Sequence, residues 1–101
     1  MMFMERQIQQ IRPGKWTELE VLDQKFNAVE QRHGYPAKRR YRCYIGGHTI
    51  NTLVIEREWE SLAALEIAYM KCFMDPEWQA VSAEYDTISE SNQVEIYLVM
   101  S

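Results

Sequence analysis

The order of two hydrophobic periodicities along this chain limits the folds it can adopt. Near the carboxyl end, every second residue from Val94 to Met100 is aliphatic, and a repeat of two is typical of a β-strand. Residues 3–11 carry a second, weaker pattern of the same kind. From residue 15 to residue 33 the apolar side chains recur every three or four positions, which predicts a helix with one buried face.

Two further strands are predicted in the middle of the chain. Residues 38–45 and 50–59 have strand-like composition, and Gly46-Gly47-His48-Thr49 separates them. Because glycine tolerates the positive φ angles that tight turns require, this segment predicts a β-hairpin.

The second half of the chain predicts two more helices. Ser61 is a candidate amino-terminal cap, and Asp75 with Pro76 predicts a new helix start, since Asp caps a helix and Pro fits its first position. The polar segment 87–92 is predicted as a loop. The resulting order is that of an α+β, ferredoxin-like βαββαβ fold with a four-stranded antiparallel sheet.

The length and charge of the chain restrict its class. With 101 residues, of which 47% are hydrophobic, we expect one globular domain spanning residues 1–101. The net charge of -4 gives no general attraction to nucleic acid or to anionic membranes. Neither is therefore expected as a partner, although a local basic run could still bind nucleic acid.

The longest uncharged stretch is 13 residues, from Cys43 to Ile55, and spanning a bilayer takes roughly 20. The apolar start is interrupted at Glu5 and Arg6, so no signal-peptide core is recognised. We expect a cytoplasmic protein. Cys43 and Cys72 lie far apart without C-x-x-C spacing, and we interpret them as reduced thiols.

One face of the predicted sheet lacks a helical cover. If both helices pack on the same face, the other presents aromatic, aliphatic and polar side chains, which together are too apolar to be left in water. Self-association into a twofold homodimer would bury this face. The alternative is a monomer with a solvated sheet.

Several segments of the chain resemble one group of proteins in their order and spacing. They are Ile11-Arg12-Pro13-Gly14-Lys15, Asn51 placed ten residues before Ser61, the run from Glu60 to Glu66, and Asp75-Pro76-Glu77-Trp78-Gln79. The chain is similar over nearly its whole length to NIPSNAP-like proteins of the dimeric α/β-barrel superfamily, with antibiotic-biosynthesis monooxygenases as neighbours.

This resemblance implies two four-stranded sheets facing each other across a dimer axis, with a cavity in each barrel-like half. It implies little about activity. NIPSNAP-like proteins share no agreed enzymatic role, whereas the monooxygenase relatives oxidise aromatic polyketides or quinones without metal or flavin. Accordingly no cofactor is expected, and whether the protein is an enzyme stays open.

The candidate ligand-binding residues lie on the strands and the hairpin. They are Asn51, Tyr44, Arg42, Tyr97, Trp59 and His48. Asn51 offers both donors and an acceptor to a ligand carbonyl or hydroxyl, although it can equally satisfy backbone groups near the hairpin. His48 can be a solvated turn residue, and the aromatic residues can belong to an ordinary core as well as to a cavity wall.

A basic run, Lys38-Arg39-Arg40-Tyr41-Arg42, precedes the predicted turn. A repeat of two sends Lys38, Arg40 and Arg42 to one face, where they would form the mouth of a site for an anionic ligand. Cross-strand pairs with Glu56, Glu58 and Glu60 explain the same pattern structurally, and we favour that interpretation.

No sequence motif assigns a reaction. The chain has no glycine-rich phosphate loop, no H-E-x-x-H and no Cys/His cluster with metal-ligand spacing, so catalytic residues are unknown and no metal is expected. Two hypotheses remain. One is a homodimer that binds a small, partly apolar organic ligand in a barrel cavity, either between helices and sheet or inside the barrel. The other is a cofactor-independent monooxygenase acting on an aromatic or quinol-type substrate.

Overall fold

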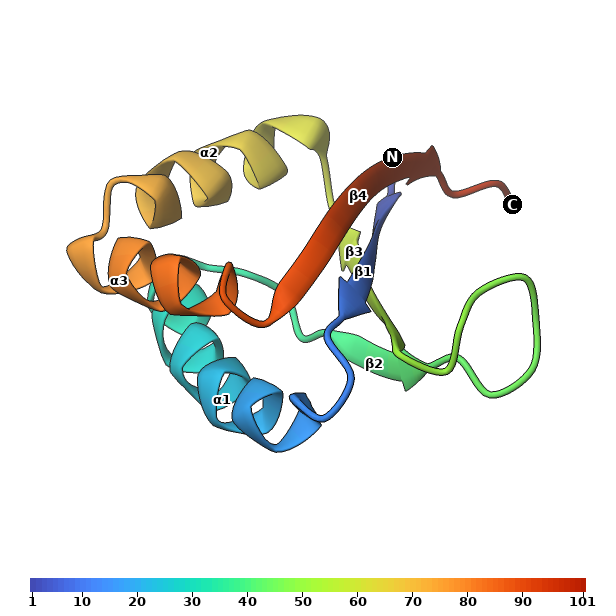
Figure 1. Ribbon diagram of the computed structural model, residues 1–101. Coiled ribbons are helices and arrows are strands. Elements are labelled where there is room, and N and C mark those ends of the chain that lie inside the picture. The colour runs from blue at the N-terminus through green and yellow to red at the C-terminus, as the bar shows by residue number, and fades with distance from the viewer.

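The computed structural model describes residues 1–101 as one layer of sheet and one layer of helices (Figure 1). The elements in chain order are β1 (Phe3–Ile11), α1 (Trp16–Arg32), β2 (Arg39–Arg42), β3 (Thr52–Trp59), α2 (Leu62–Phe73), α3 (Pro76–Tyr85) and β4 (Ser89–Leu98). The predicted α+β, ferredoxin-like arrangement is confirmed. The second helix of the βαββαβ order is divided into two consecutive helices, α2 and α3, which start after Ser61 and Asp75 as the sequence predicts.

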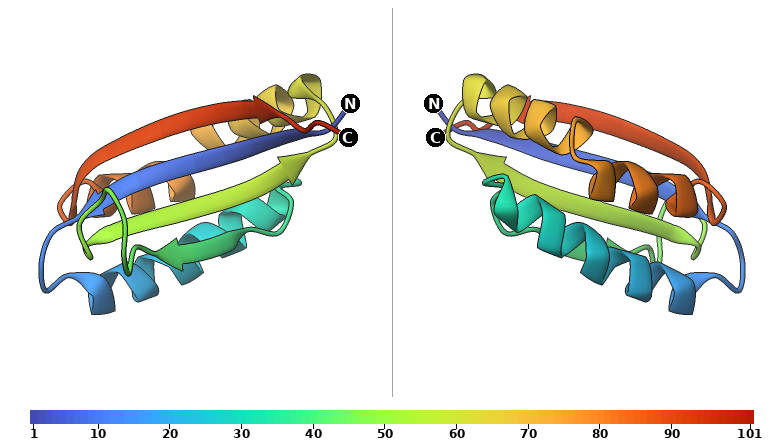
Figure 2. Two further views of the ribbon diagram at one scale, coloured as in Figure 1. Left: turned by 90° about the vertical axis from the view of Figure 1, so that its right-hand side faces the viewer. Right: turned by 90° about the vertical axis from the view of Figure 1, so that its left-hand side faces the viewer.

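The four strands form one antiparallel sheet in the order β2-β3-β1-β4. All three helices lie on the same side of this sheet, and the other side carries none (Figure 2). The molecule is accordingly flat, with principal extents of 38 × 35 × 17 Å. None of its helices is both long and apolar enough to cross a bilayer.

The helix ends follow the capping residues that the sequence predicts. The Ser61 hydroxyl accepts a hydrogen bond from the Ala64 N–H at 3.0 Å, and the Asp75 carboxylate accepts one from the Glu77 N–H at 2.8 Å. Gly34 follows Arg32, the last residue of α1, and the cap His33. Its φ of +80° suits glycine, because a residue with a Cβ is strained in that conformation.

The hairpin in the middle of the chain differs from its predicted form. Strand β2 is shorter than the predicted strand over residues 38–45, and β3 begins at Thr52 rather than Ile50. After Arg42 only the Cys43 N–H still bonds across, to the Thr52 carbonyl. The connection is therefore a long loop, residues 43–51, instead of a tight turn at residues 46–49, and Cys43 lies in this loop rather than in a strand.

The carboxyl-terminal strand β4 begins five residues before the apolar alternation that starts at Val94. The sequence predicts a loop over residues 87–92, but β4 begins at Ser89 and pairs with β1 through Ser91↔Gln10 and Asn92↔Gln9. Backbone groups make these ladders, so polar side chains do not prevent them. The strand ends at Leu98, before Met100.

The two edges of the sheet are unequal. Strand β2 has four residues, three of them arginine, whereas β4 has ten residues and contains no lysine, arginine or proline. In β4, Val94, Ile96 and Leu98 lie on the helix side yet are each about half exposed. No helix makes extensive contact with this strand.

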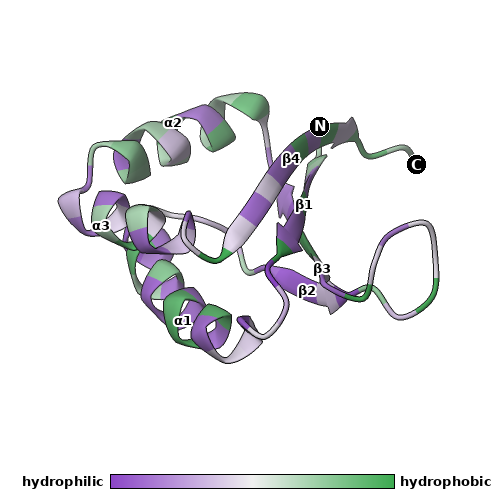
Figure 3. Cartoon of the chain, viewed as in Figure 1, coloured by the Kyte–Doolittle hydropathy of each residue, from purple (hydrophilic) through white to green (hydrophobic).

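The apolar core lies between the helices and the inner side of β3. One buried cluster contains Leu19, Leu22 and Leu53 with Ile55, and a second gathers around Trp59. Hydrophilic segments run along much of β1 and β4 (Figure 3). The core therefore covers only part of the interlayer space.

The acid dependence of stability tests the contact that joins α1 to the α2–α3 turn. His33 and Arg32 donate to Asp75 at 2.7 and 2.9 Å and hold the pKa of its carboxyl well below its usual range. In Asp75→Asn the cap is kept and the charge is lost, so we expect a lower thermal midpoint at pH 7. Because the carboxylate stabilises only while ionised, the difference from the native chain should shrink as the pH falls below about 4.

Thermal unfolding followed by circular dichroism between pH 3 and pH 7 measures this difference. Glu18→Gln, which removes the exposed pair between Lys15 and Glu18, is the control and should change little at any pH. A difference that widens as the pH falls from 4 to 3 would contradict the assignment.

Candidate functional site

A row of polar side chains on β1 points toward the helices. Its members are Glu5, Gln7 and Gln9, of which Glu5 is 1% and Gln9 5% exposed. Gln9 and Gln7 lie opposite Leu53 and Ile55 of β3 in the register, and residues paired across strands share a face of the sheet. The apolar side chains of β3 therefore fix the polar side of β1 on the inside.

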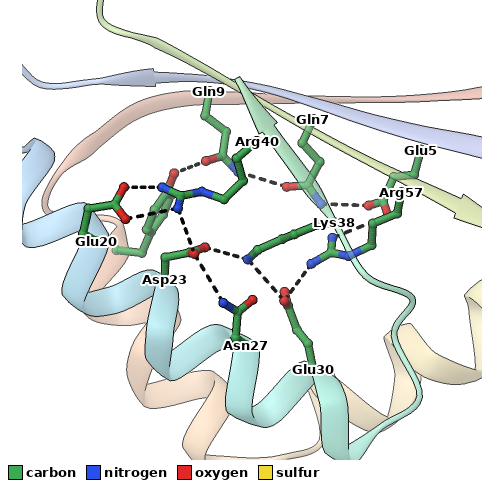
Figure 4. Close-up of polar contacts among 11 residues, drawn as sticks. Glu5, Gln7, Gln9, Glu20, Asp23, Asn27, Glu30, Lys38, Arg40 and Arg57 are labelled. Carbon is green, nitrogen blue, oxygen red and sulfur yellow. Dashed lines mark hydrogen bonds and ion pairs between the residues drawn. The ribbon is translucent and has the colours of Figure 1, made fainter. Parts of the chain in front are cut away.

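These side chains form one directed chain of hydrogen bonds (Figure 4). The Tyr85 hydroxyl donates to Gln9 Oε1, Gln9 Nε2 donates to Gln7 Oε1 at 2.9 Å, and Gln7 Nε2 donates to Glu5 Oε2 at 2.8 Å. Every donor in the chain thus points toward the buried carboxylate. That carboxylate also accepts from Trp59 Nε1 at 3.0 Å.

Buried phenols border both ends of the row. The Tyr69 hydroxyl donates to Glu5 at one end, and Tyr85 occupies the other. Burial raises the pKa of both tyrosines above the ordinary value. Both therefore stay neutral hydrogen-bond donors across the physiological range.

Buried ion pairs continue the polar network toward α1. Arg57 Nη2 contacts Glu30 Oε1 at 2.6 Å and Arg57 Nη1 lies 3.7 Å from Glu5 Oε1. Lys38 Nζ lies between two carboxylates of α1, 2.6 Å from Asp23 and 3.4 Å from Glu30. The side chains of Arg57 and Lys38 are only 2% and 8% exposed, so solvent screens these pairs weakly.

The basic run finds its partners on a helix rather than on the neighbouring strand. Arg40 donates to Glu20 at 3.1 Å, and this bond lowers the pKa of the Glu20 carboxyl. Lys38 and Arg40 thus pair with acidic residues of α1 on the inner side of the sheet. The predicted cross-strand pairing of these two residues with Glu56, Glu58 and Glu60 is wrong, since those glutamates do not share their face.

A cavity of about 630 Å³ lies above this network, between the sheet and the helices. Gln7, Gln9, Leu53 and Ile55 line it from the sheet. The helices contribute an aromatic wall made of Phe26, Tyr69, Phe73, Trp78 and Tyr85. Within this wall the Phe73 and Trp78 rings lie 4.9 Å apart and the Phe26 and Tyr85 rings 5.6 Å apart.

The rim of the cavity is formed by residues 89–92 at the start of β4 and by Ser82 and Asp86 beside them. Its volume is in the range of sites that bind small organic molecules. No group of three or more His, Cys, Asp or Glu side chains is placed to hold a metal ion. Cys72 is a buried free thiol and Cys43 a half-buried one.

The six residues proposed from sequence lie outside this cavity. Asn51 and Arg42 come together at the base of the 43–51 loop, where Asn51 Oδ1 accepts from Trp16 Nε1 at 2.9 Å and Arg42 lies 4.0 Å above the Trp16 ring. Their arrangement braces the loop, and their role in ligand binding stays a prediction.

The other four candidates are spread over the molecule. Tyr44 and His48 lie in the exposed loop, and Tyr97 lies on the helix-free face of the sheet beside Arg6. Trp59 is buried and touches the polar row through its bond to Glu5. The structure therefore does not gather the six into one site.

One signal for the cavity is present in the sequence. Leu19, Asp23, Phe26 and Glu30 follow one another at helical steps of four, three and four, which places two carboxylates on the apolar face of α1. Charged residues on an inward face require buried partners. Those partners are Lys38 and Arg40, which follow α1 in sequence, and Arg57 of the more distant β3.

This fold and cavity define a ferredoxin-like α+β protein with a polar-floored chamber between its layers. Among solved structures, a NIPSNAP family protein from Agrobacterium tumefaciens superposes with a TM-score of 0.84 at 24% sequence identity, covering 99% of this chain and 87% of that chain. A NIPSNAP-like domain protein from Burkholderia xenovorans gives 0.83 at 22% identity, covering 99% and 86%. The predicted resemblance to NIPSNAP-like proteins is confirmed in the fold.

An oxygenase shares this fold. A variant of SnoaB, a cofactor-independent oxygenase from Streptomyces nogalater, superposes with a TM-score of 0.75 at 13% identity, covering 99% of this chain and 94% of that chain. No family model matches the sequence, and no curated protein sequence is significantly similar to it. At these identities the shared property is the fold.

Stability measurements test the buried ion pairs under the cavity. Arg57→Met removes the cation that faces Glu5 and Glu30 and leaves both carboxylates buried without it, so we expect a loss of about 3–5 kcal/mol in the free energy of unfolding. Arg12→Met, which breaks an exposed pair with Glu90 at 3.7 Å, should cost less than about 1 kcal/mol. Urea titrations of the two variants that gave equal losses would refute the argument.

Proposed function

We propose that this protein is a homodimer that binds a small, partly apolar organic ligand in the cavity between its sheet and helices. The observation that carries this proposal is the combination of an aromatic wall on one side and a row of amide side chains on the other, around about 630 Å³ of space. An apolar chamber with a few convergent polar groups is the usual form of a small-molecule site.

The amide row defines the polar groups of the ligand. Gln7 and Gln9 each use one N–H in the row, and an amide nitrogen carries two. The remaining N–H groups are donors for an oxygen acceptor such as a ring carbonyl. A ligand of this kind would satisfy them without disturbing the chain that ends at Glu5.

The charges around the cavity favour a neutral ligand. Three cationic side chains, Arg40, Lys38 and Arg57, stand among four carboxylates in the network. Because each cation already contacts a carboxylate, none is free to neutralise a ligand anion. The aromatic wall adds a preference for a flat ring, which packs edge-on or offset against other rings.

The homodimer is supported by the surface of the single chain. Its accessible area of 6610 Å² exceeds the roughly 6,000 Å² expected for a compact monomer of its 12.0 kDa. The helix-free face carries Ile8 and Val54 and the half-exposed rings of Tyr41 and Tyr97. A second sheet packed on this face would remove these side chains from water.

Flavone, a flat and neutral ring ketone, is the probe for the ligand site. Trp78 lines the cavity, so flavone should quench tryptophan fluorescence with a dissociation constant on the order of 100 µM. Gln9→Leu should weaken binding about tenfold, since it removes one hydrogen-bond donor. A flavone carboxylic acid should bind more weakly than flavone itself.

The matched control is Gln10→Leu, because Gln10 is the next residue of β1 and faces away from the cavity. It should leave flavone binding unchanged. Asn51→Ala separates the two candidate sites: if it weakens binding while Gln9→Leu does not, the ligand lies at the loop base and the cavity assignment is wrong.

A cofactor-independent monooxygenase is the second candidate function, favoured by the structural likeness to SnoaB and by the buried donors of the cavity. An electron-rich ring ketone would lose a proton from its ring methylene and react with O₂. The carbon would become a carbonyl with one oxygen atom, and the other oxygen atom would leave as water with the two methylene hydrogens. Donors that stabilise the ring oxyanion would lower the barrier.

Oxygen uptake tests this alternative. Anthrone, which fits the reaction, should be consumed with an equal amount of O₂ faster than in buffer, and Gln9→Leu should slow the reaction at least about tenfold. Gln10→Leu is again the control. Binding of flavone without catalysed uptake would support the binding protein and reject the oxygenase.

A further inference from the structure

The loop of residues 43–51 is tied down at its base. Arg42 Nε donates to the Ile50 carbonyl at 2.7 Å, the Cys43 N–H bonds to Thr52, and the Thr52 N–H bonds to the Thr49 carbonyl at 3.2 Å. Cys43 Sγ also contacts the His48 carbonyl at 3.4 Å. These contacts at both ends of the loop fix the direction in which it leaves the sheet.

The apolar side chains of the loop, here called its tip, are uncovered. Tyr44 is 86% and Ile45 88% exposed, and Ile50 on the returning side is 55% exposed. Large apolar side chains on a protruding loop are unfavourable in water unless something covers them. The chain itself supplies no cover.

The loop stands on the helix-free side of the sheet. Thr49 Oγ1 contacts Gln10 Oε1 at 3.4 Å, and Gln10 is on that side of β1. In Figure 2 the loop rises in front of the sheet, on the side away from the helices, and in Figure 1 it extends away from the helical layer. Any second copy that covers the sheet must meet this loop.

The sheet alone offers too little surface for a stable pair. The four strands lie about 4.8 Å apart and are about eight residues long on average, which gives a flat face of about 500 Å², whereas a stable interface needs about 800 Å² from each partner. The three apolar loop side chains add on the order of 400 Å². The loop would supply the area that the face lacks.

The helix-free face also has a matching apolar band. Tyr41, Val54 and Ile8 are register partners on adjacent strands and form one continuous row across β2, β3 and β1. The next row contains Arg6 beside Glu56, at 2.9 Å, and is charged. An apolar tip therefore has one preferred place on a facing sheet.

We propose that the 43–51 loop of each copy packs across the helix-free sheet of the other, with Tyr44 and Ile45 against the partner's Tyr41–Val54–Ile8 row. The inference rests on the homodimer of the proposed function and names the segment that stabilises it. Twofold symmetry makes this contact twice in each dimer.

Analytical ultracentrifugation of the native chain and of Ile45→Asp tests the contact. One buried hot-spot residue is worth at least about 30-fold in affinity, and symmetry doubles the effect on the free energy. We expect a native dimer and a dissociation constant about 1,000-fold higher for Ile45→Asp. Val21→Asp, an exposed aliphatic residue of α1 on the helical layer, should dimerise like the native chain.

Circular dichroism checks that the variants fold, and a Tyr44→Ser, Ile45→Ser double variant repeats the test without adding charge. A native chain that is monomeric at 100 µM would overturn both the homodimer and the loop contact. A native dimer whose dissociation constant is unchanged in both loop variants would overturn the loop contact alone. Loss of binding to phosphatidylcholine vesicles by the variants, with dimerisation intact, would assign the tip to a lipid surface and also overturn it.

Discussion

The buried carboxylate of Glu5 is the group around which the inner side of this molecule is arranged. A carboxylate withdrawn from water is costly unless donors and a cation surround it. Trp59 from β3, Tyr69 from α2 and Gln7 from the same strand supply the donors, and Arg57 supplies the charge. Arg57 also contacts Glu30, so α1 is held by the same network. Sheet and helices are thus joined in part by polar contacts of fixed geometry, which leave a chamber that a wholly apolar core would have filled.

The fold follows from patterns that are local in sequence. Helical spacing, the caps at Ser61 and Asp75 and the alternation near the carboxyl end give the elements and their order. The boundaries of the strands do not follow in the same way, because pairing is a property of two segments. Residues 89–92 carry no strand signal of their own and extend β4 only because β1 offers them backbone partners. Residues 43–45 and 50–51 have strand-like composition but lie in the loop, because the pairing between β2 and β3 does not continue beyond Cys43 and Thr52.

The interior site could not be deduced to the same extent. Alternation in β1 separates Met4 and Ile8 from Glu5, Gln7 and Gln9, but it does not state which set faces inward. The register with β3 decides which set faces inward, because the apolar side chains of β3 pack on the inner face. The six sequence candidates are isolated polar or aromatic residues of the hairpin and the strands. The network that the structure shows depends instead on charges from α1, β2 and β3 meeting in space.

The unequal edges of the sheet bear on how the chain behaves at high concentration. The arginines of β2 discourage another strand from adding there, whereas the ten-residue edge of β4 has no lysine, arginine or proline to do so. Its aliphatic side chains are also half exposed. Free chains at high concentration would therefore add to one another along β4, strand by strand. A dimer formed through the helix-free faces would leave this edge unpaired, so the edge stays open to strand addition however strong the contact between the faces is.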